Sequence, residues 1–148
     1  MSSYRQIFYQ IVFSTKHREP TLNMEHDATL YKYMWGIIQN KNCHLYQING
    51  IEDHIHIVTD LHPYICLADL VKDIKVASSI WLKGCGLFPN FTSWQLGYAA
   101  FTYSNREICK IINYVKKQKA HHKKEDFVTE YKRMLTGAWM ARCWRGQA

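Results

Sequence analysis

Residues 44–61, HLYQINGIEDHIHIVTDL, predict two β-strands, 44–51 and 53–61, rich in apolar and β-branched residues. The pair Asn49-Gly50 has strong hairpin-turn chemistry, because both residues tolerate positive φ. Two consecutive strands joined by a tight turn are incompatible with the strict strand–helix alternation that builds a parallel sheet. We therefore expect an antiparallel or mixed sheet.

The flanking sequence predicts the other elements. Residues 4–14 are rich in β-branched and aromatic residues, and their apolar run is nearly continuous after Gln10, which indicates a central strand. Helical spacing begins at residue 21 and ends at the polar run 39–42. An amphipathic helix is expected over 67–84, a strand over 96–103, a helix over 105–122 and a short helix over 125–135. This order predicts an α+β, ferredoxin-like α/β sandwich, a mainly antiparallel sheet covered by helices. We expect a single domain, 1–148, with the tail 136–148 unassigned.

Composition narrows the class of protein. The chain has 148 residues, of which 47% are hydrophobic, enough for one domain with a real core. Nineteen Lys and Arg against twelve Asp and Glu give a formal charge of +7, which favours a polyanionic partner such as nucleic acid. Five widely spaced cysteines without a C-x-x-C pair fit a reducing cytoplasm. Neither a signal peptide nor a membrane span is predicted, so we expect a soluble, cytoplasmic protein.

His54 and His56 are the first candidate site residues. Residues i and i+2 of a strand point to the same face, so the two imidazoles form a potential clamp for a metal ion. The alternative is a pair of half-exposed strand residues that hydrogen-bond to water or to backbone.

The helix over 105–122 supplies the second group. At about 100° per residue, Ile108, Ile112 and Val115 form the predicted core-facing stripe. Tyr114 and Gln118, four residues apart, stand together on a face that also carries Glu107, Lys110, Lys117 and His121. The alternative is a tyrosine that half covers a surface helix.

If strand and helix meet, two imidazoles and the Gln118 amide oxygen make a three-ligand site for a divalent ion. Tyr114 could then attack a phosphodiester that the ion polarises, with Lys110 and Lys117 favouring the phenolate. The phosphotyrosine product would preserve the energy of the broken bond, so no nucleotide cofactor is required.

Together these features resemble the single-tyrosine HUH transposases of bacterial insertion sequences, the IS200-like family, including domesticated relatives associated with repetitive palindromes. The resemblance rests on His-Ile-His in IEDHIHIVTD, a single helical Tyr and a Gln four residues later. The blocks IVFSTKHR, LADLVKDIKVASSIWLK, FTSWQLGYAAFTYS and INYVKKQKAHH extend it over about residues 4–135.

The resemblance implies specific roles. His54, His56 and Gln118 would be metal ligands, and Tyr114 the nucleophile that becomes attached to a DNA 5′ end. It also implies ferredoxin-like homodimers, Mg²⁺ or Mn²⁺, and single-stranded DNA hairpins as partners, with the tyrosine acting in its own subunit or in the partner. Since imidazole suits manganese better than magnesium, a manganese preference is expected in vitro.

Basic clusters are candidate DNA contacts. The predicted set is Lys16, Arg18, Lys75, Lys110, Lys117 and His121. Trp94, Tyr98 and Tyr103 either stack on unpaired bases or belong to the core, and we rank the basic loop at residues 16–18 above them.

Two other functions stay open. HIHIV resembles part of the motif of histidine-triad nucleotide hydrolases, but Val58 stands where the third histidine should be. A domesticated protein that binds hairpin DNA without cleaving it would keep the fold and lose the chemistry.

Overall fold

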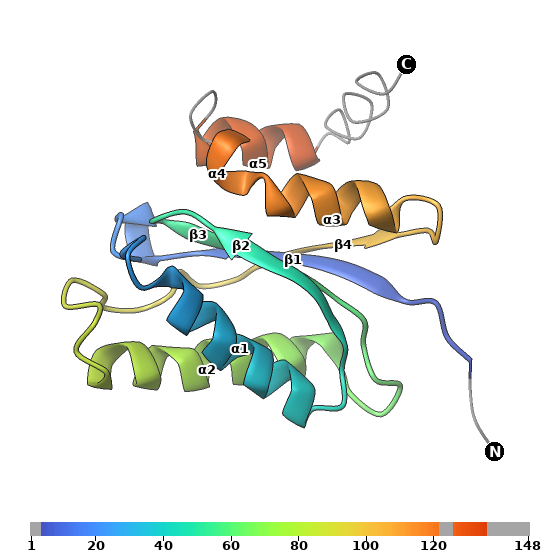
Figure 1. Ribbon diagram of the computed structural model, residues 1–148, viewed down its shortest axis with the longest axis horizontal. Helices are drawn as coiled ribbons and strands as arrows, with labels where there is room; N and C mark the ends of the chain where they lie inside the picture. The colour runs from blue at the N-terminus through green and yellow to red at the C-terminus, as the bar shows by residue number, and fades with distance from the viewer. Residues whose placement is uncertain (1–3, 122–125, 136–148) are drawn as a thin grey trace.

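The computed structural model describes residues 4–121 and 126–135 and contains a four-stranded sheet (Figure 1). Its strands are β1 (Phe8–Ser14), β2 (Leu45–Gly50), β3 (His54–Thr59) and β4 (Ala99–Tyr103). They lie in the order β2-β3-β1-β4, and every neighbouring pair is antiparallel. The prediction that the first strand is central is confirmed, because β1 pairs with β3 on one side and β4 on the other.

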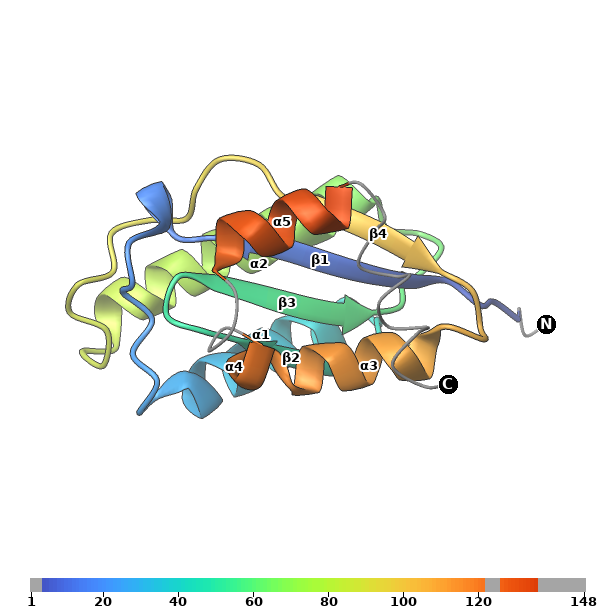
Figure 2. The same cartoon turned by 90° about the horizontal axis from the view of Figure 1, so that it is seen from above.

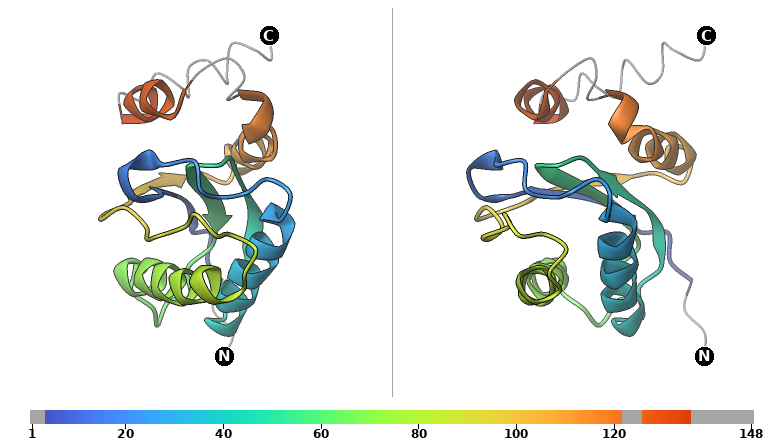
Figure 3. Two further views of the ribbon diagram at one scale, coloured as in Figure 1. Left: turned by 90° about the vertical axis from the view of Figure 1, so that its left-hand side faces the viewer. Right: turned by 60° about the vertical axis from the view of Figure 1, so that its left-hand side comes forward.

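Helices cover both faces of the sheet (Figures 1 and 3). The helices α1 (Asp27–Asn40) and α2 (Leu67–Gly84) pack on one face. The opposite face carries α3 (Ile108–Lys116), α4 (Gln118–His121) and α5 (Phe127–Leu135). A short 3₁₀ turn, η1 (Lys16–Arg18), follows β1. The order β1-α1-β2-β3-α2-β4 is that of the predicted ferredoxin-like sandwich.

Alternation along the strands separates two cores. In β1 and β3, Ile11, Phe13, Ile55 and Ile57 belong to the core beneath α1 and α2. The residues between them point to the other face, where Phe8, Val12 and Val58 pack against Ile111 and Val115 of α3. Because both faces are covered, β3 is buried along its whole length. This burial explains why its sequence is apolar apart from its two histidines and the terminal threonine.

The predicted turn at Asn49-Gly50 is wrong. Both residues lie inside β2, where Asn49 pairs with His56 and Gly50 with Ile55, and the turn comes later, at residues 51–53. A side chain at Gly50 would place its Cβ 2.3 Å from the carbonyl oxygen of His54. The glycine is therefore required by close approach of the two backbones rather than by a turn.

Several other boundaries differ from the predicted ones. The first helix begins at Asp27 instead of residue 21, and the strands begin at Phe8 and Ala99 instead of residues 4 and 96. The helix predicted over 105–122 breaks at Lys117 into α3 and α4, and α5 lies within the predicted range 125–135. The tail 136–148 and residues 122–125 lie outside the described part. Among the described residues, none of the helices combines the length and apolarity needed to cross a bilayer.

Candidate functional site

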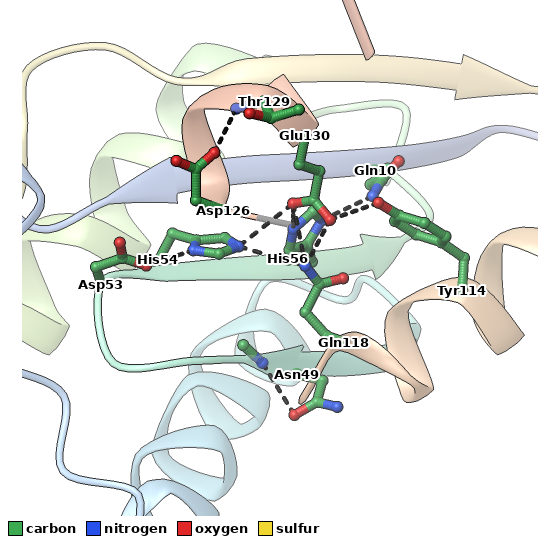
Figure 4. Close-up of polar contacts among 11 residues, drawn as sticks. Gln10, Asn49, Asp53, His54, His56, Tyr114, Gln118, Asp126, Thr129 and Glu130 are labelled. Carbon is green, nitrogen blue, oxygen red and sulfur yellow. Dashed lines mark hydrogen bonds and ion pairs between the residues drawn. The ribbon is translucent and has the colours of Figure 1, made fainter. Parts of the chain in front are cut away.

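His54 and His56 lie side by side on the face of β3 that α3 and α5 cover (Figure 4). Their ring centroids are 5.0 Å apart, and both side chains are fully buried. Their partners on β1 are Ser14 and Val12. The alternative of two half-exposed strand residues is therefore wrong, and two buried imidazoles require specific partners.

Each imidazole is oriented through its Nδ1 atom. His54 Nδ1 lies 2.7 Å from Asp53 Oδ1, the carboxylate–histidine arrangement that commonly supports metal-binding histidines. His56 Nδ1 lies 2.8 Å from the Gln10 amide nitrogen, and the Tyr103 hydroxyl donates to Gln10 Oε1 over 2.6 Å. The Nε2 atoms of both rings lie near one carboxylate oxygen, Glu130 Oε1. Burial lowers the pKa of His54, but contacts with Asp53 and Glu130 outweigh burial and raise this pKa overall.

Glu130 brings a carboxylate to the two imidazoles from α5. Asp126 accepts a hydrogen bond from the Thr129 backbone N–H over 2.9 Å at the start of this helix, a typical N-cap, which fixes Glu130 one turn in. Glu130 Oε1 lies 3.0 Å from His56 Nε2 and 3.4 Å from His54 Nε2, and the Glu130 side chain is fully buried. Sequence reasoning missed this residue.

Tyr114 is buried against the sheet, which corrects the helical face predicted for it. The buried face of α3 runs through Ile108, Ile111 and Val115, so the stripe is rotated by roughly 60° from the predicted one and includes Tyr114. The Tyr114 hydroxyl donates to Glu130 Oε2 over 2.5 Å. The alternative of a tyrosine that half covers a surface helix is therefore wrong.

Gln118 is buried on the same side, at the start of α4. Its amide nitrogen donates to both Glu130 oxygens, over 3.0 and 2.8 Å, and lies 3.4 Å from His54 Nε2. The structure therefore brings the four predicted residues together around a fifth, Glu130 (Figure 4).

The segment formed by α3 and α4, which carries Tyr114 and Gln118, packs on the strand that carries the histidines of the same chain. Lys119 of α4 contacts Asp27 of α1 over 2.9 Å and donates to Asn49 of β2 over 2.6 Å. Asn49 in turn donates to the carbonyl oxygen of Lys116 over 3.0 Å. These contacts hold the α3–α4 segment against β2, so within one chain Tyr114 and Gln118 lie beside His54 and His56.

The donor atoms fit a divalent metal ion. One ligand atom from each of His54, His56 and Glu130 lies within 4.8 Å of the others. Two imidazoles with one carboxylate suit manganese and other first-row ions, and the carboxylate also suits magnesium. In this arrangement Glu130 offers a third donor atom, and the Gln118 amide lies against the same carboxylate. Gln118 as a ligand stays a prediction.

The predicted DNA-contacting residues do not form one surface. Lys16 and Arg18 are exposed in η1, directly after β1, and Lys117 is exposed at the break between α3 and α4. Lys75 instead donates to the carbonyl oxygens of Gln95 and Gly97, over 2.7 and 2.9 Å, and burial lowers its pKa. Lys110 is half-buried on α3; His121 ends α4, but the placement of its side chain lies outside what the structure describes.

The three aromatic candidates separate into two groups. Trp94 is buried, and its indole N–H donates to Ser78 Oγ over 3.0 Å, while Tyr103 donates to Gln10. These two side chains therefore serve the interior. Tyr98 is 40% exposed and stays a candidate for stacking on a base.

Comparison with known proteins identifies the family. Residues 3–118, well over half of the chain, match the family model described as "Transposase IS200 like". The chain belongs to the IS200-like transposase family. Comparison with curated proteins gave no match. Membership in this family, together with a buried Val58 in place of a third histidine, leaves the histidine-triad alternative without support.

Two solved structures of transposases share the fold. A transposase structure from Deinococcus radiodurans R1 has 21% sequence identity and a TM-score of 0.62, covering 80% of this chain and 95% of that one. The structure of a REP-associated tyrosine transposase bound to a REP hairpin has 17% identity and a TM-score of 0.58, covering 82% of this IS200-like chain and 74% of the other. At these identities the likeness establishes the fold, an α+β arrangement with a four-stranded antiparallel sheet.

Proposed function

We propose that the protein cleaves and rejoins single-stranded DNA at hairpin-containing ends, with Tyr114 as the nucleophile. One observation carries the proposal: the phenol of Tyr114 and the imidazoles of His54 and His56 contact opposite oxygens of the same buried carboxylate, Glu130. A phenol and two potential ligands around one carboxylate suit phosphoryl transfer better than simple DNA binding.

In the proposed reaction the Tyr114 oxygen attacks phosphorus, and the bond from phosphorus to the 3′ oxygen breaks. The phenolic proton passes to Glu130 Oε2, which already accepts it in a 2.5 Å hydrogen bond. The departing 3′ oxygen takes a proton from water to become a 3′ hydroxyl, and the 5′ phosphate stays on Tyr114. Attack by another 3′ hydroxyl on this linkage reverses the step, so rejoining needs no nucleotide cofactor.

Metal binding is part of the proposal. His54, His56 and Glu130 would hold Mg²⁺ or Mn²⁺, with Gln118 as a further ligand if its amide turns over to present oxygen. When bound, such an ion would withdraw charge from the phosphodiester and favour attack. In the described structure both histidines are fully buried and Glu130 of α5 contacts both, so a DNA phosphate reaches them only after neighbouring side chains move.

Hairpin DNA is the proposed substrate because a structurally similar transposase was solved with a REP hairpin. The exposed Lys16, Arg18 and Lys117 would contact phosphates, which predicts salt-sensitive binding. A homodimer stays a prediction from the family resemblance. One chain already brings Tyr114 to its own histidines, so a partner is not needed to complete the group of residues described here.

Covalent capture tests the proposal. Labelled single-stranded hairpin oligonucleotides, incubated with the protein and Mn²⁺, should give a protein–DNA adduct that resists denaturation. Tyr114→Phe should abolish the adduct and His54→Ala should abolish cleavage, both with DNA binding retained. Tyr64→Phe, which changes a fully exposed tyrosine, is the matched control and should behave as wild type.

The alternative is a domesticated hairpin-binding protein. Binding by wild type without any adduct, or an adduct that persists in Tyr114→Phe, would contradict the proposed chemistry. The first result would support the alternative.

A further inference from the structure

A pocket of about 210 Å³ lies beside the histidine pair. Val12 and Ser14 form part of its floor, and these are the residues that pair with His56 and His54 across the sheet. Adjacent strands are about 5 Å apart, so the floor lies one strand away from the proposed chemistry. Tyr131, the residue after Glu130, also lines the pocket. Figure 2 shows α5 lying over β1 and next to β4.

Hydrogen bonds hold the rim of the pocket, residues 95–97, in place. The segment before β4 is tied to β1, because the Gln95 N–H donates to the Ser14 carbonyl over 2.8 Å and the Gln95 side chain accepts from the His17 N–H over 2.9 Å. Lys75 bridges the carbonyl oxygens of Gln95 and Gly97. Gly97 has a φ of +84°, a conformation that favours glycine. These constraints fix a concave edge before any ligand arrives.

The lining fits an unpaired nucleobase. Tyr98 and Tyr131 provide aromatic surface, Arg18 provides a cation, and Ser14 adds a polar side chain to the lining. The volume of about 210 Å³ is below the range of roughly 300–1,000 Å³ that is typical of sites for drug-sized ligands, so the pocket suits a smaller group such as one base. Pockets that accept bases extruded from a strand combine such stacking surfaces with polar groups at the base edge. Arg18 and the neighbouring Lys16 carry the charge expected where a phosphate backbone enters.

We propose that this pocket, between η1, the segment 95–98 and Tyr131, binds one nucleobase of the single-stranded DNA next to the phosphate that is cut. The inference rests on the proposed function and adds a base-reading subsite to it. Lys75 acts there as a positioning residue that holds the rim, and not as a phosphate contact. Tyr98 is the side chain whose removal tests the subsite, because it is partly exposed and its loss leaves the core intact.

The probe is a library of single-stranded oligonucleotides, each with one stable hairpin and randomised flanks, selected by binding to the wild-type protein. One flank position should show a base preference. An abasic site at that position should weaken binding by about 5- to 150-fold, the range expected for loss of one stacked base. Tyr98→Ala should weaken binding of the intact oligonucleotide by a similar factor. It should cause no further loss with the abasic oligonucleotide, because both changes remove the same contact.

Tyr64→Ala is the matched control, since Tyr64 is exposed and is not among the residues lining the pocket, and it should leave both affinities unchanged. The subsite is refuted if Tyr98→Ala has no effect, or if its loss multiplies with the abasic loss at every flank position. Because binding is measured without cleavage, absence of a Tyr114 adduct would overturn the proposed chemistry and leave the subsite standing. Failure to bind any hairpin would overturn both.

Discussion

Replacing Glu130 by Gln changes the charge of the candidate site with little change in shape. Glu130 Oε1 faces both imidazoles, while Oε2 accepts the Tyr114 hydroxyl. A neutral amide has one acceptor oxygen instead of two, so its oxygen can either accept from the Tyr114 hydroxyl or face the imidazoles, but not both. The variant also removes the anionic ligand. We therefore expect Glu130→Gln to bind Mn²⁺ much more weakly than wild type.

The size of the effect follows from linkage between metal binding and folding. Loss of groups that only support metal ligands typically costs 10- to 100-fold in affinity, so loss of a direct anionic ligand is taken as about 100-fold. At a Mn²⁺ concentration of about 100 times the wild-type Kd, the ion stabilises wild type by about 2.7 kcal/mol and the variant by about 0.4 kcal/mol. For a chain of this length the difference corresponds to roughly 5–9 °C in Tm.

The assay is the increase in Tm on adding Mn²⁺, measured separately for each variant so that differences between the metal-free proteins cancel. Glu107→Gln is the matched control, because its carboxylate accepts from Ser104 at the start of α3 and lies outside the cluster. It should keep the full increase, and His54→Ala should lose it. If Glu130→Gln keeps the wild-type increase while His54→Ala loses it, Glu130 is not a ligand and the assignment of the third donor is wrong.

Two further substitutions test how the site is held. Lys119→Met removes the contacts with Asp27 and β2 and should lower the free energy of unfolding in urea by about 1–2 kcal/mol, a value reduced for partial exposure. The control Lys116→Met, at an exposed side chain, should change this free energy little, and equal losses in the two variants would refute the role of Lys119. Gly50→Ala puts a methyl group 2.3 Å from the His54 carbonyl oxygen and should lower the free energy of unfolding by about 1–3 kcal/mol. The control Gly36→Ala, in open space on α1, should raise this free energy, and a neutral Gly50→Ala would contradict the close approach of the strands.

The architecture was predictable because it depends on patterns within single segments. The two successive strands between helices excluded a parallel sheet, and the helical spacing over 67–84 ends at Gly84 as predicted. The turn was misplaced because Asn49-Gly50 is a strong local signal for a hairpin turn. In the folded chain the same glycine is needed for backbone approach at Ile55, a tertiary demand that local propensity does not reveal.

The site was predictable only in part, since its residues come from separate elements. The period of a strand was enough to place His54 and His56 on one face. The helical face predicted for Tyr114 was wrong because apolar residues at both 111 and 112 allow two apolar stripes. Only packing on the sheet selects the stripe through Ile111. Glu130 left a weaker signal: it is four residues before the buried Met134, so a carboxylate occupies the apolar side of a helix.

The charge of the chain has more than one role, which limits what composition can say about DNA. Arg5, Lys41 and Lys119 form ion pairs with acidic residues, and Lys75 is committed to backbone carbonyls. Summed charge therefore overstates the surface available to phosphates. The basic residues of η1 are exposed at the end of β1, and Arg18 lines the pocket whose floor includes the strand partners of both histidines. A strand of DNA that crosses η1 can place a phosphate near the histidines and a base in the pocket together, so we expect affinity and choice of cleavage position to depend on this end of the sheet more than on total charge.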